Sequence, residues 1–150
     1  MSKPMGAIPP GFEAQDGVLA IGGRRADVLV EQAGGTPLFV YDFGIVRRQV
    51  ERFRSAFRSV NLHYAIKANT YNGILENISK LVDGLDVASE GEMRAALASG
   101  AEAADISFAG PGKRDPDLAD AINEGITLNA ESEGEVERAL AIGAKLGRRP

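Results

Sequence analysis

Four short apolar runs recur along the chain from residue 62 onward at nearly even spacing. They occupy residues 62–66, 85–88, 106–109 and 126–128, and their first residues lie 23, 21 and 20 positions apart. An amphipathic segment of helical length follows each run. Parallel strands that are buried on both faces need a helical crossover between them, so this alternation predicts repeated βα units and an α/β fold.

The residues before these units form a different pattern. Residues 1–35 are rich in Pro and Gly and are expected to be a short lead-in, with a strand at 18–21 and a helical turn at 28–30. Residues 38–41 predict a further strand, and Asp42 stands where a helix N-cap would. The helix that follows has apolar residues at spacings of 4, 3 and 4, from Val46 to Phe57.

Two architectures accommodate repeated βα units: a doubly wound open sheet, and a (βα)8 barrel of roughly 250 residues. The length of 150 residues favours the open sheet. The motifs favour the barrel, because no G-x-G-x-x-G follows the first strand and no G-x-x-x-x-G-K-[ST] occurs. The turn that ends in Lys113 has neither spacing and is expected to be a tight loop before a helix that Asp115 caps.

Composition excludes several classes of site. The chain has no Cys and one histidine, His63, which leaves no thiolate zinc site and little basis for a histidine metal site or a Ser/His/Asp triad. The net charge of −4, with 17 basic residues scattered among 21 acidic ones, argues against a nucleic-acid partner. Neither a signal-peptide core nor a membrane span is present in the sequence, which predicts a cytoplasmic protein.

Lys67 closes the first apolar run, in the string Tyr-Ala-Ile-Lys-Ala-Asn. Two interpretations fit this position. In the first, the strand simply ends there and the amine lies in solvent. In the second, the amine is held at the carboxyl end of a barrel strand, where active sites lie, and serves as a Schiff-base lysine. Asp86 interrupts the second run, and a buried carboxylate needs a partner, for which Lys67 is the natural candidate.

Two Ser and Glu pairs have the spacing of a capping box. Ser89 with Glu92, and Ser132 with Glu135, each precede a helical segment. Capping explains all four residues without any chemistry, although Glu92 follows Asp86 closely enough to lie near the same site.

Four strings together resemble the pyridoxal phosphate (PLP) dependent decarboxylases that act on diaminopimelate, ornithine and arginine, whose barrel is like that of alanine racemase. The strings are HYAIKAN at 63–69, GLDVASEGE at 84–92, FAGPGK at 108–113 and GITLNAESEGEVER at 125–138. The resemblance implies that residues 36–150 form the first half, about four βα units, of a PLP-binding TIM barrel, and that the lead-in at 1–35 would pack on a second β domain. It further implies that the phosphate-binding segment and the partner of the pyridine nitrogen belong to the other half.

The resemblance also implies roles for individual residues. Lys67 would hold pyridoxal 5′-phosphate as a Schiff base, Asp86 would be a carboxylate beside it, Ala65 and Asn69 would be pocket neighbours, and Glu92 would lie close by. His63 is expected to be structural, because the family's ring-stacking imidazole comes from a later strand.

The implied function is decarboxylation of a basic or diamino amino acid by a homodimer, with conversion of meso-diaminopimelate to lysine as the first choice. The 150 residues alone are expected to be an inactive fragment. A PLP-dependent racemase, a non-catalytic PLP-binding homologue of the same barrel, and an unrelated small α/β binding domain remain as alternatives. Release of carbon dioxide, as opposed to inversion at the α-carbon, distinguishes the decarboxylase from the racemase.

Overall fold

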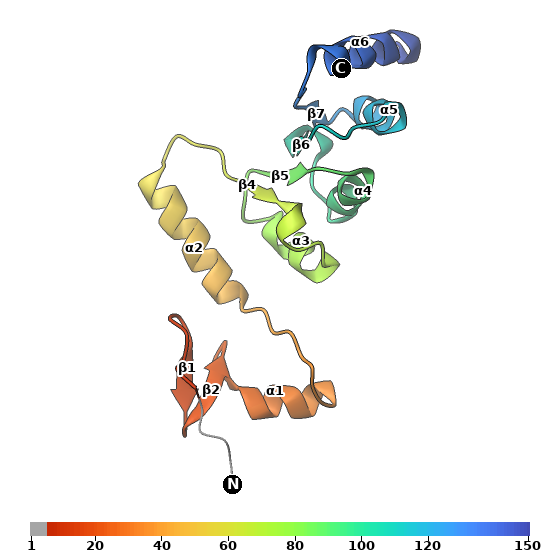
Figure 1. The fold of residues 1–150 in the computed structure, drawn as a ribbon. Helices are drawn as coiled ribbons and strands as arrows, with labels where there is room; N and C mark the ends of the chain where they lie inside the picture. The colour runs from red at the N-terminus through yellow and green to blue at the C-terminus, as the bar shows by residue number, and fades with distance from the viewer. Residues whose placement is uncertain (1–5) are drawn as a thin grey trace. The chain divides into compact units, whose positions relative to one another are not determined.

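The computed structural model describes residues 6–150, which divide into two compact units (Figure 1). The first unit extends to Ser55, and the second runs from Ala56 to Pro150. Within these residues every helix is too short or too polar to cross a lipid bilayer.

The first unit is built on a small antiparallel sheet. Strands β1 (Glu13–Gln15), β2 (Val18–Ile21) and β3 (Arg24–Arg25) pair in that order, and helices α1 (Ala26–Ala33) and α2 (Phe43–Ala56) follow. The predicted strand at 18–21 and helical turn at 28–30 are confirmed. Asp42 is confirmed as the residue that caps α2, because its Oδ1 accepts the Gly44 N–H at 2.7 Å.

The strand predicted at residues 38–41 is wrong. These residues have no regular secondary structure and join neither described sheet. Phe39 in this run is 84% exposed, so the run is not buried like a central strand. A short apolar run satisfies the local requirement for a strand, but a strand also needs a neighbour to complete its hydrogen bonds, and the local sequence does not reveal one.

The second unit consists of four successive βα pairs. Its strands are β4 (His63–Ala65), β5 (Gly84–Val87), β6 (Ile106–Phe108) and β7 (Thr127–Leu128), and its helices are α3 (Asn72–Ile78), α4 (Glu90–Ala98), α5 (Asp115–Glu124) and α6 (Glu133–Leu146). Short 3₁₀ turns, η1 (Ile66–Ala68) and η2 (Ala103–Asp105), flank two of the strands. The predicted alternation of strands and helices is confirmed.

Strand order favours a barrel over a doubly wound sheet. The four strands are parallel and pair in the order β4-β5-β6-β7, so each strand lies beside the next one in the chain. Helices α3 to α6 all lie along one side of the sheet (Figure 1). A doubly wound sheet reverses its strand order at a switch point and has helices on both faces, whereas a barrel keeps one direction and one helical side.

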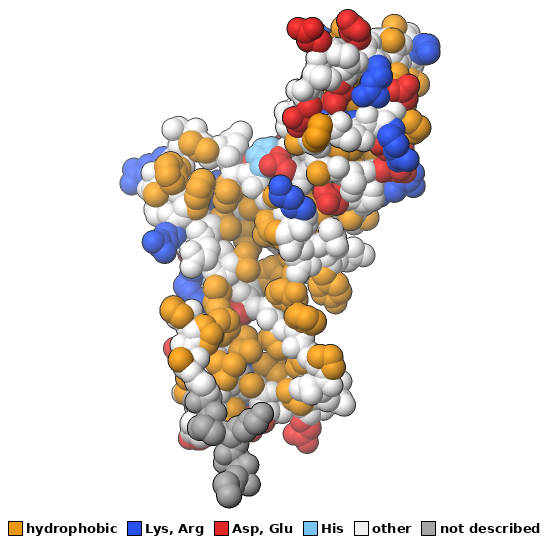
Figure 2. All heavy atoms as spheres, viewed as in Figure 1, with side chains coloured by type: hydrophobic (Ala, Val, Ile, Leu, Met, Phe, Trp, Pro, Cys, Tyr) orange, Lys and Arg blue, Asp and Glu red, His pale blue; other side chains and the backbone are white. Residues whose placement is uncertain are grey.

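Side chains alternate between the two faces of the sheet. Leu85 and Val87 are buried, and Asp86 between them points to the opposite face and stays partly exposed. Burial of an aliphatic side chain of this size contributes about 1.5–3 kcal/mol. The buried side chains lie between the strands and their helices, while charged side chains of both signs cover the surface of α4 to α6 (Figure 2).

Helix α5 begins one residue away from the predicted position. Its N-cap is Arg114, not Asp115, and Asp117 reaches back to accept the Arg114 N–H at 2.8 Å. Hydrogen bonds from the Arg114 side chain lower the pKa of the Asp117 carboxyl, which is nearly buried. The helix start is therefore held by a carboxylate that reaches back from its first turn.

Gly84, at the start of β5, allows a close approach between neighbouring strands. A Cβ atom at this position would lie 2.3 Å from the Asp105 carbonyl oxygen and 2.5 Å from His63 Cε1. The backbone oxygen cannot move away without disturbing the entry to β6.

We expect Gly84→Ala to lower the free energy of unfolding by about 1–3 kcal/mol, because overpacking forces the backbone to shift. Denaturant unfolding measures the change. Gly91→Ala in α4 is the matched control, since a Cβ there meets nothing within 4 Å, and alanine is the better helix former by up to about 1 kcal/mol. Equal stability of the two variants would contradict the packing argument.

Candidate active site

The carboxyl ends of the four parallel strands meet along one rim. The register places Ala65 opposite Asp86, Asp86 opposite Ser107, and Ser107 opposite Thr127. These four residues share the face of the sheet that points away from the helices. The loops that leave the strands, and the side chains of this row, are therefore neighbours in space although they are about 20 residues apart in sequence.

A cavity of 110 Å³ opens at this rim. Its lining consists of Ala65, Lys67, Asp86, Val87, Ala88, Glu92 and Ala109. Four of the five predicted site residues thus lie together. The fifth, Asn69, is outside the lining.

Lys67 lies in the η1 turn, immediately after β4, and is exposed. Among the described residues its ammonium has no hydrogen bond or ion pair, and the expected pair with Asp86 is not formed. Lys67 lies in the tight turn after the end of β4 and not in the strand, so it is outside the row of paired residues that contains Asp86. The amine is left at the cavity without a competing partner.

Asp86 has partners on both sides. Its Oδ1 accepts a hydrogen bond from the Ser107 hydroxyl on β6, and His63 Nδ1 on β4 lies 3.4 Å from the same oxygen. The expectation that His63 is structural stands as a prediction, and its contact links it to Asp86.

Glu92 combines a structural contact with a place in the cavity wall. The Ser89 hydroxyl accepts the Glu92 N–H at 3.3 Å, as in a capping box, but Glu92 Oε2 accepts the N–H of Ala88 at 2.8 Å and not that of Ser89. The reciprocal bond is thus displaced by one residue. It also holds the end of β5 beside the cavity.

Asn69 ends the η1 turn. Its backbone N–H donates to the Ile66 carbonyl at 2.9 Å, and its Oδ1 accepts the Tyr71 N–H at 2.9 Å. The side chain therefore helps to shape the segment that follows Lys67.

Sequence reasoning missed Val87, Ala88 and Ala109 as lining residues. Their positions could have revealed them, since each stands at or just after the end of a strand.

A second lysine, Lys113, has the opposite environment. Its side chain is 1% exposed, and its Nζ donates to Gly110 O, Asn129 O and Glu135 Oε1 at 2.7, 2.8 and 2.8 Å. All three N–H groups of the ammonium are used. This amine is neither accessible nor free to react. Lys67 is the one described lysine in the cavity lining.

The capping box predicted for Ser132 and Glu135 is half formed. The Ser132 hydroxyl accepts the Glu135 N–H at 3.2 Å, but the Glu135 carboxylate turns inward to Lys113. A buried ammonium requires such a partner, and this requirement outweighs the local capping bond.

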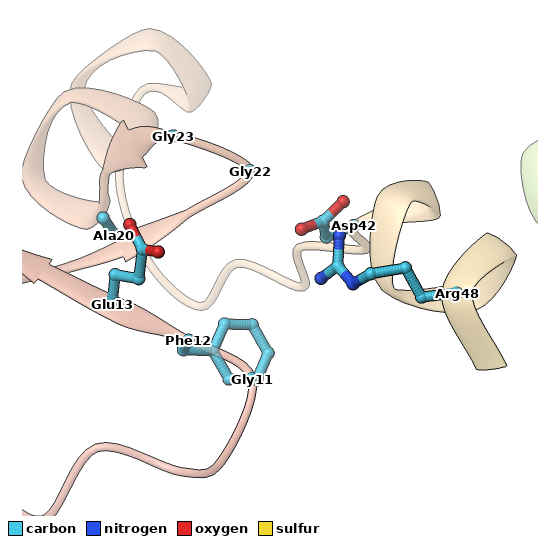
Figure 3. Close-up of a pocket in the computed structure, with 8 residues that line it drawn as sticks. All are labelled: Gly11, Phe12, Glu13, Ala20, Gly22, Gly23, Asp42 and Arg48. Atoms are coloured by element: carbon cyan, nitrogen blue, oxygen red, sulfur yellow. The ribbon is translucent and has the colours of Figure 1, made fainter. Parts of the chain in front are cut away.

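A larger cavity, of 270 Å³, lies within the first unit (Figure 3). Its lining includes Phe12, Glu13, Asp42 and Arg48, and Figure 3 shows the Arg48 guanidinium directed toward the Asp42 carboxylate. No lysine lines it. Among the described residues, no group of three or more His, Asp or Glu side chains is placed to hold a metal ion.

The rim cavity therefore offers one type of chemistry above others. An accessible primary amine at the end of a strand can attack an aldehyde carbon, and two carboxylates stand in the same cavity wall. Three alanine side chains of the lining are small and apolar. These features fit pyridoxal phosphate, whose aldehyde condenses with a lysine amine.

Known proteins support the same interpretation. Residues 43–145 match the family model described as pyridoxal-dependent decarboxylase, pyridoxal binding domain. A diaminopimelate decarboxylase from Neisseria meningitidis serogroup B is 36% identical over 120 residues, which are 78% of this chain and 29% of that protein.

Two solved structures resemble the fold. AQ1208 from Aquifex aeolicus has a TM-score of 0.86 and 35% identity, and the match covers 93% of this chain and 35% of that one. Diaminopimelate decarboxylase from Helicobacter pylori, complexed with L-lysine, has a TM-score of 0.74 and 32% identity, and the match covers 81% and 32%.

The chain thus spans about a third of the length of these relatives. The family model covers more than half of the chain, and it includes all four strand ends that form the rim. On this evidence the chain belongs to the pyridoxal-dependent decarboxylase family.

Proposed function

We propose that the whole protein decarboxylates meso-diaminopimelate to lysine with pyridoxal phosphate, and that Lys67 is its covalent anchor for the cofactor. One observation carries the proposal: Lys67 is the one described lysine in the rim cavity, and its amine is exposed and unpaired there. Lys113 is locked by three hydrogen bonds and cannot replace it.

The chemistry divides between cofactor and protein. When bound, pyridoxal phosphate supplies the electron sink that makes loss of carbon dioxide possible. The role of the protein chain is to bind the cofactor and to orient it and the substrate. Lys67 Nζ would hold the cofactor by a covalent bond to its aldehyde carbon.

The other predicted residues complete the proposed pocket. Asp86 places a negative charge beside Lys67, and its contacts with Ser107 and His63 hold that charge in one orientation. Ala65 provides a small side chain beside Asp86 on the neighbouring strand. We assign Asn69 to shaping the segment that follows Lys67. We assign Glu92 to the cavity wall, where it holds the end of β5 in place.

The choice of substrate rests on relatives. The Neisseria protein carries the name diaminopimelate decarboxylase, and the Helicobacter structure contains L-lysine, the expected product. We further propose that the whole protein acts in the cytoplasm as a homodimer, as the family resemblance implies.

The covalent anchor can be tested by chemical trapping. Borohydride reduces a lysine–PLP linkage to a stable amine, so we expect peptide mapping of the treated whole protein to place the added mass on Lys67. Lys67→Ala should abolish the label and lower kcat at least about 1,000-fold, because the covalent step is lost. Lys80→Ala, at an exposed lysine outside the cavity, is the control. Label on any other lysine would refute the assignment.

The role of Asp86 can be tested by removing its charge. We expect Asp86→Asn to raise the Kd for pyridoxal phosphate by about 10-fold or more, since a hydrogen bond to a charged group contributes about 1.5–3 kcal/mol. Fluorescence titration of the cofactor measures this. Asp120→Asn, on α5 away from the cavity, is the control and should leave the Kd unchanged. Equal Kd values for the unsubstituted protein and both variants would exclude a role for Asp86 in cofactor binding.

The substrate assignment makes a separate prediction. We expect carbon dioxide release from meso-diaminopimelate with a kcat/KM at least about 100-fold above that for ornithine or arginine, because a site built to bind the distal polar groups rejects analogues that lack them. Inversion at the α-carbon without carbon dioxide release would instead indicate a racemase.

A further inference from the structure

The buried ammonium of Lys113 connects two loops of the strand rim. Gly110 follows β6, whereas Asn129 and Glu135 follow β7, and Nζ binds all three within 2.8 Å. The ammonium also lies 5.5 Å from the centre of the Phe108 ring, at the end of β6. One cation thereby fixes the distance between neighbouring loops.

Gly110 is held from both sides. Its carbonyl accepts from Lys113 at 2.7 Å, and its N–H donates to Glu131 Oε1 at 2.7 Å. Its φ of +98° is a conformation that glycine adopts without strain. We refer to these contacts of Gly110 with Lys113 and Glu131 as the Gly110 clamp.

The Gly110 clamp adjoins the rim cavity. Ala109, the preceding residue, lines the cavity and donates its N–H to the Val87 carbonyl at 2.9 Å. A Cβ at Gly110 would lie 3.8 Å from the Cβ of Ala88, another lining residue. A shift of Gly110 would therefore move the wall that faces Lys67.

Stability alone does not explain why Lys113 and Glu135 form a buried ion pair. Replacing a buried ion pair by apolar residues of similar size is often neutral or stabilising, whereas removing one partner is costly. Lys113 instead has a geometric effect that an apolar residue would lack, because it binds carbonyl oxygens in two loops at once.

We propose that Lys113 is a positioning residue for the cofactor: through the Gly110 clamp it holds the cavity wall at Ala109 in place opposite Lys67. This inference rests on the proposed function of the cavity. Lys113 touches neither cofactor nor substrate in this role.

The test compares variants that separate stability from positioning. Lys113→Met leaves Glu135 buried and unpaired, so it should lower the unfolding midpoint. The double variant Lys113→Met with Glu135→Met removes both charges and should restore most of that midpoint. Glu131→Ala breaks the clamp at an exposed residue and leaves the buried pair intact. Lys145→Met, at an exposed lysine on α6, is the matched control.

Two measurements on the whole protein carry the result. Hydrogen exchange without cofactor should show the Gly110 amide exchanging about 10-fold faster in the double variant and in Glu131→Ala, with β5 amides unchanged. Cofactor titration should show the Kd for pyridoxal phosphate raised about 10-fold in the double variant and about 3-fold in Glu131→Ala, as expected for a weakened wall contact.

Each outcome decides the proposal. Unchanged exchange at Gly110 in both clamp variants overturns the clamp, and faster exchange with an unchanged Kd reduces Lys113 to a purely structural residue. If the unsubstituted protein is not labelled at Lys67, the proposed function itself fails, and the role of Lys113 toward the cofactor fails with it. Loss of cofactor affinity only in proportion to loss of stability, with the double variant recovering both, also overturns the proposal.

Discussion

The parallel register of four short strands is the constraint on which the rest of the second unit depends. Because β4 to β7 run in the same direction and each pairs with the next, their carboxyl ends meet at one edge. The pairing of Ala65 with Asp86 brings the lysine turn beside the second strand, and the pairing of Asp86 with Ser107 provides the carboxylate with a hydrogen-bond donor. A shift of one residue in this register would turn Asp86 toward the helices.

The same register separates two lysines of the same chemical type into different roles. Lys67 follows its strand in a tight turn and keeps an exposed, unpaired amine. Lys113 lies under the rim on the helical side, where burial requires that every N–H be bonded. Reactivity therefore follows from environment, since an amine must be accessible and able to lose a proton before it can attack an aldehyde.

Polar contacts show where local sequence rules are modified by packing. Ser89 and Ser132 both cap their helices as their spacing predicts. Their glutamates do not complete the expected boxes, because Glu92 bonds Ala88 and Glu135 bonds Lys113. In both cases the alternative partner belongs to the rim, and it lies at a position that the capping pattern alone does not reveal.

Much of this protein was predictable from sequence. The even spacing of the apolar runs predicted the four strands and their helices, because strand burial and helical crossover both leave periodic signals. The four strings at the strand ends together predicted the family, which the family match confirms. The strand predicted at 38–41 was wrong, because a short apolar run does not reveal whether another strand lies beside it to complete its hydrogen bonds.

The sequence by itself determined the order of strands and helices, the lysine at the end of the first strand and the carboxylate in the second, because these depend on local periodicity and residue type. The family resemblance also predicted the barrel, and the observed strand order agrees with it. Only the tertiary structure decided the pairing of Asp86 with His63 and Ser107, and the burial of Lys113. Those features depend on contacts between residues about 20 or more positions apart, and such contacts exist only after the strands have paired.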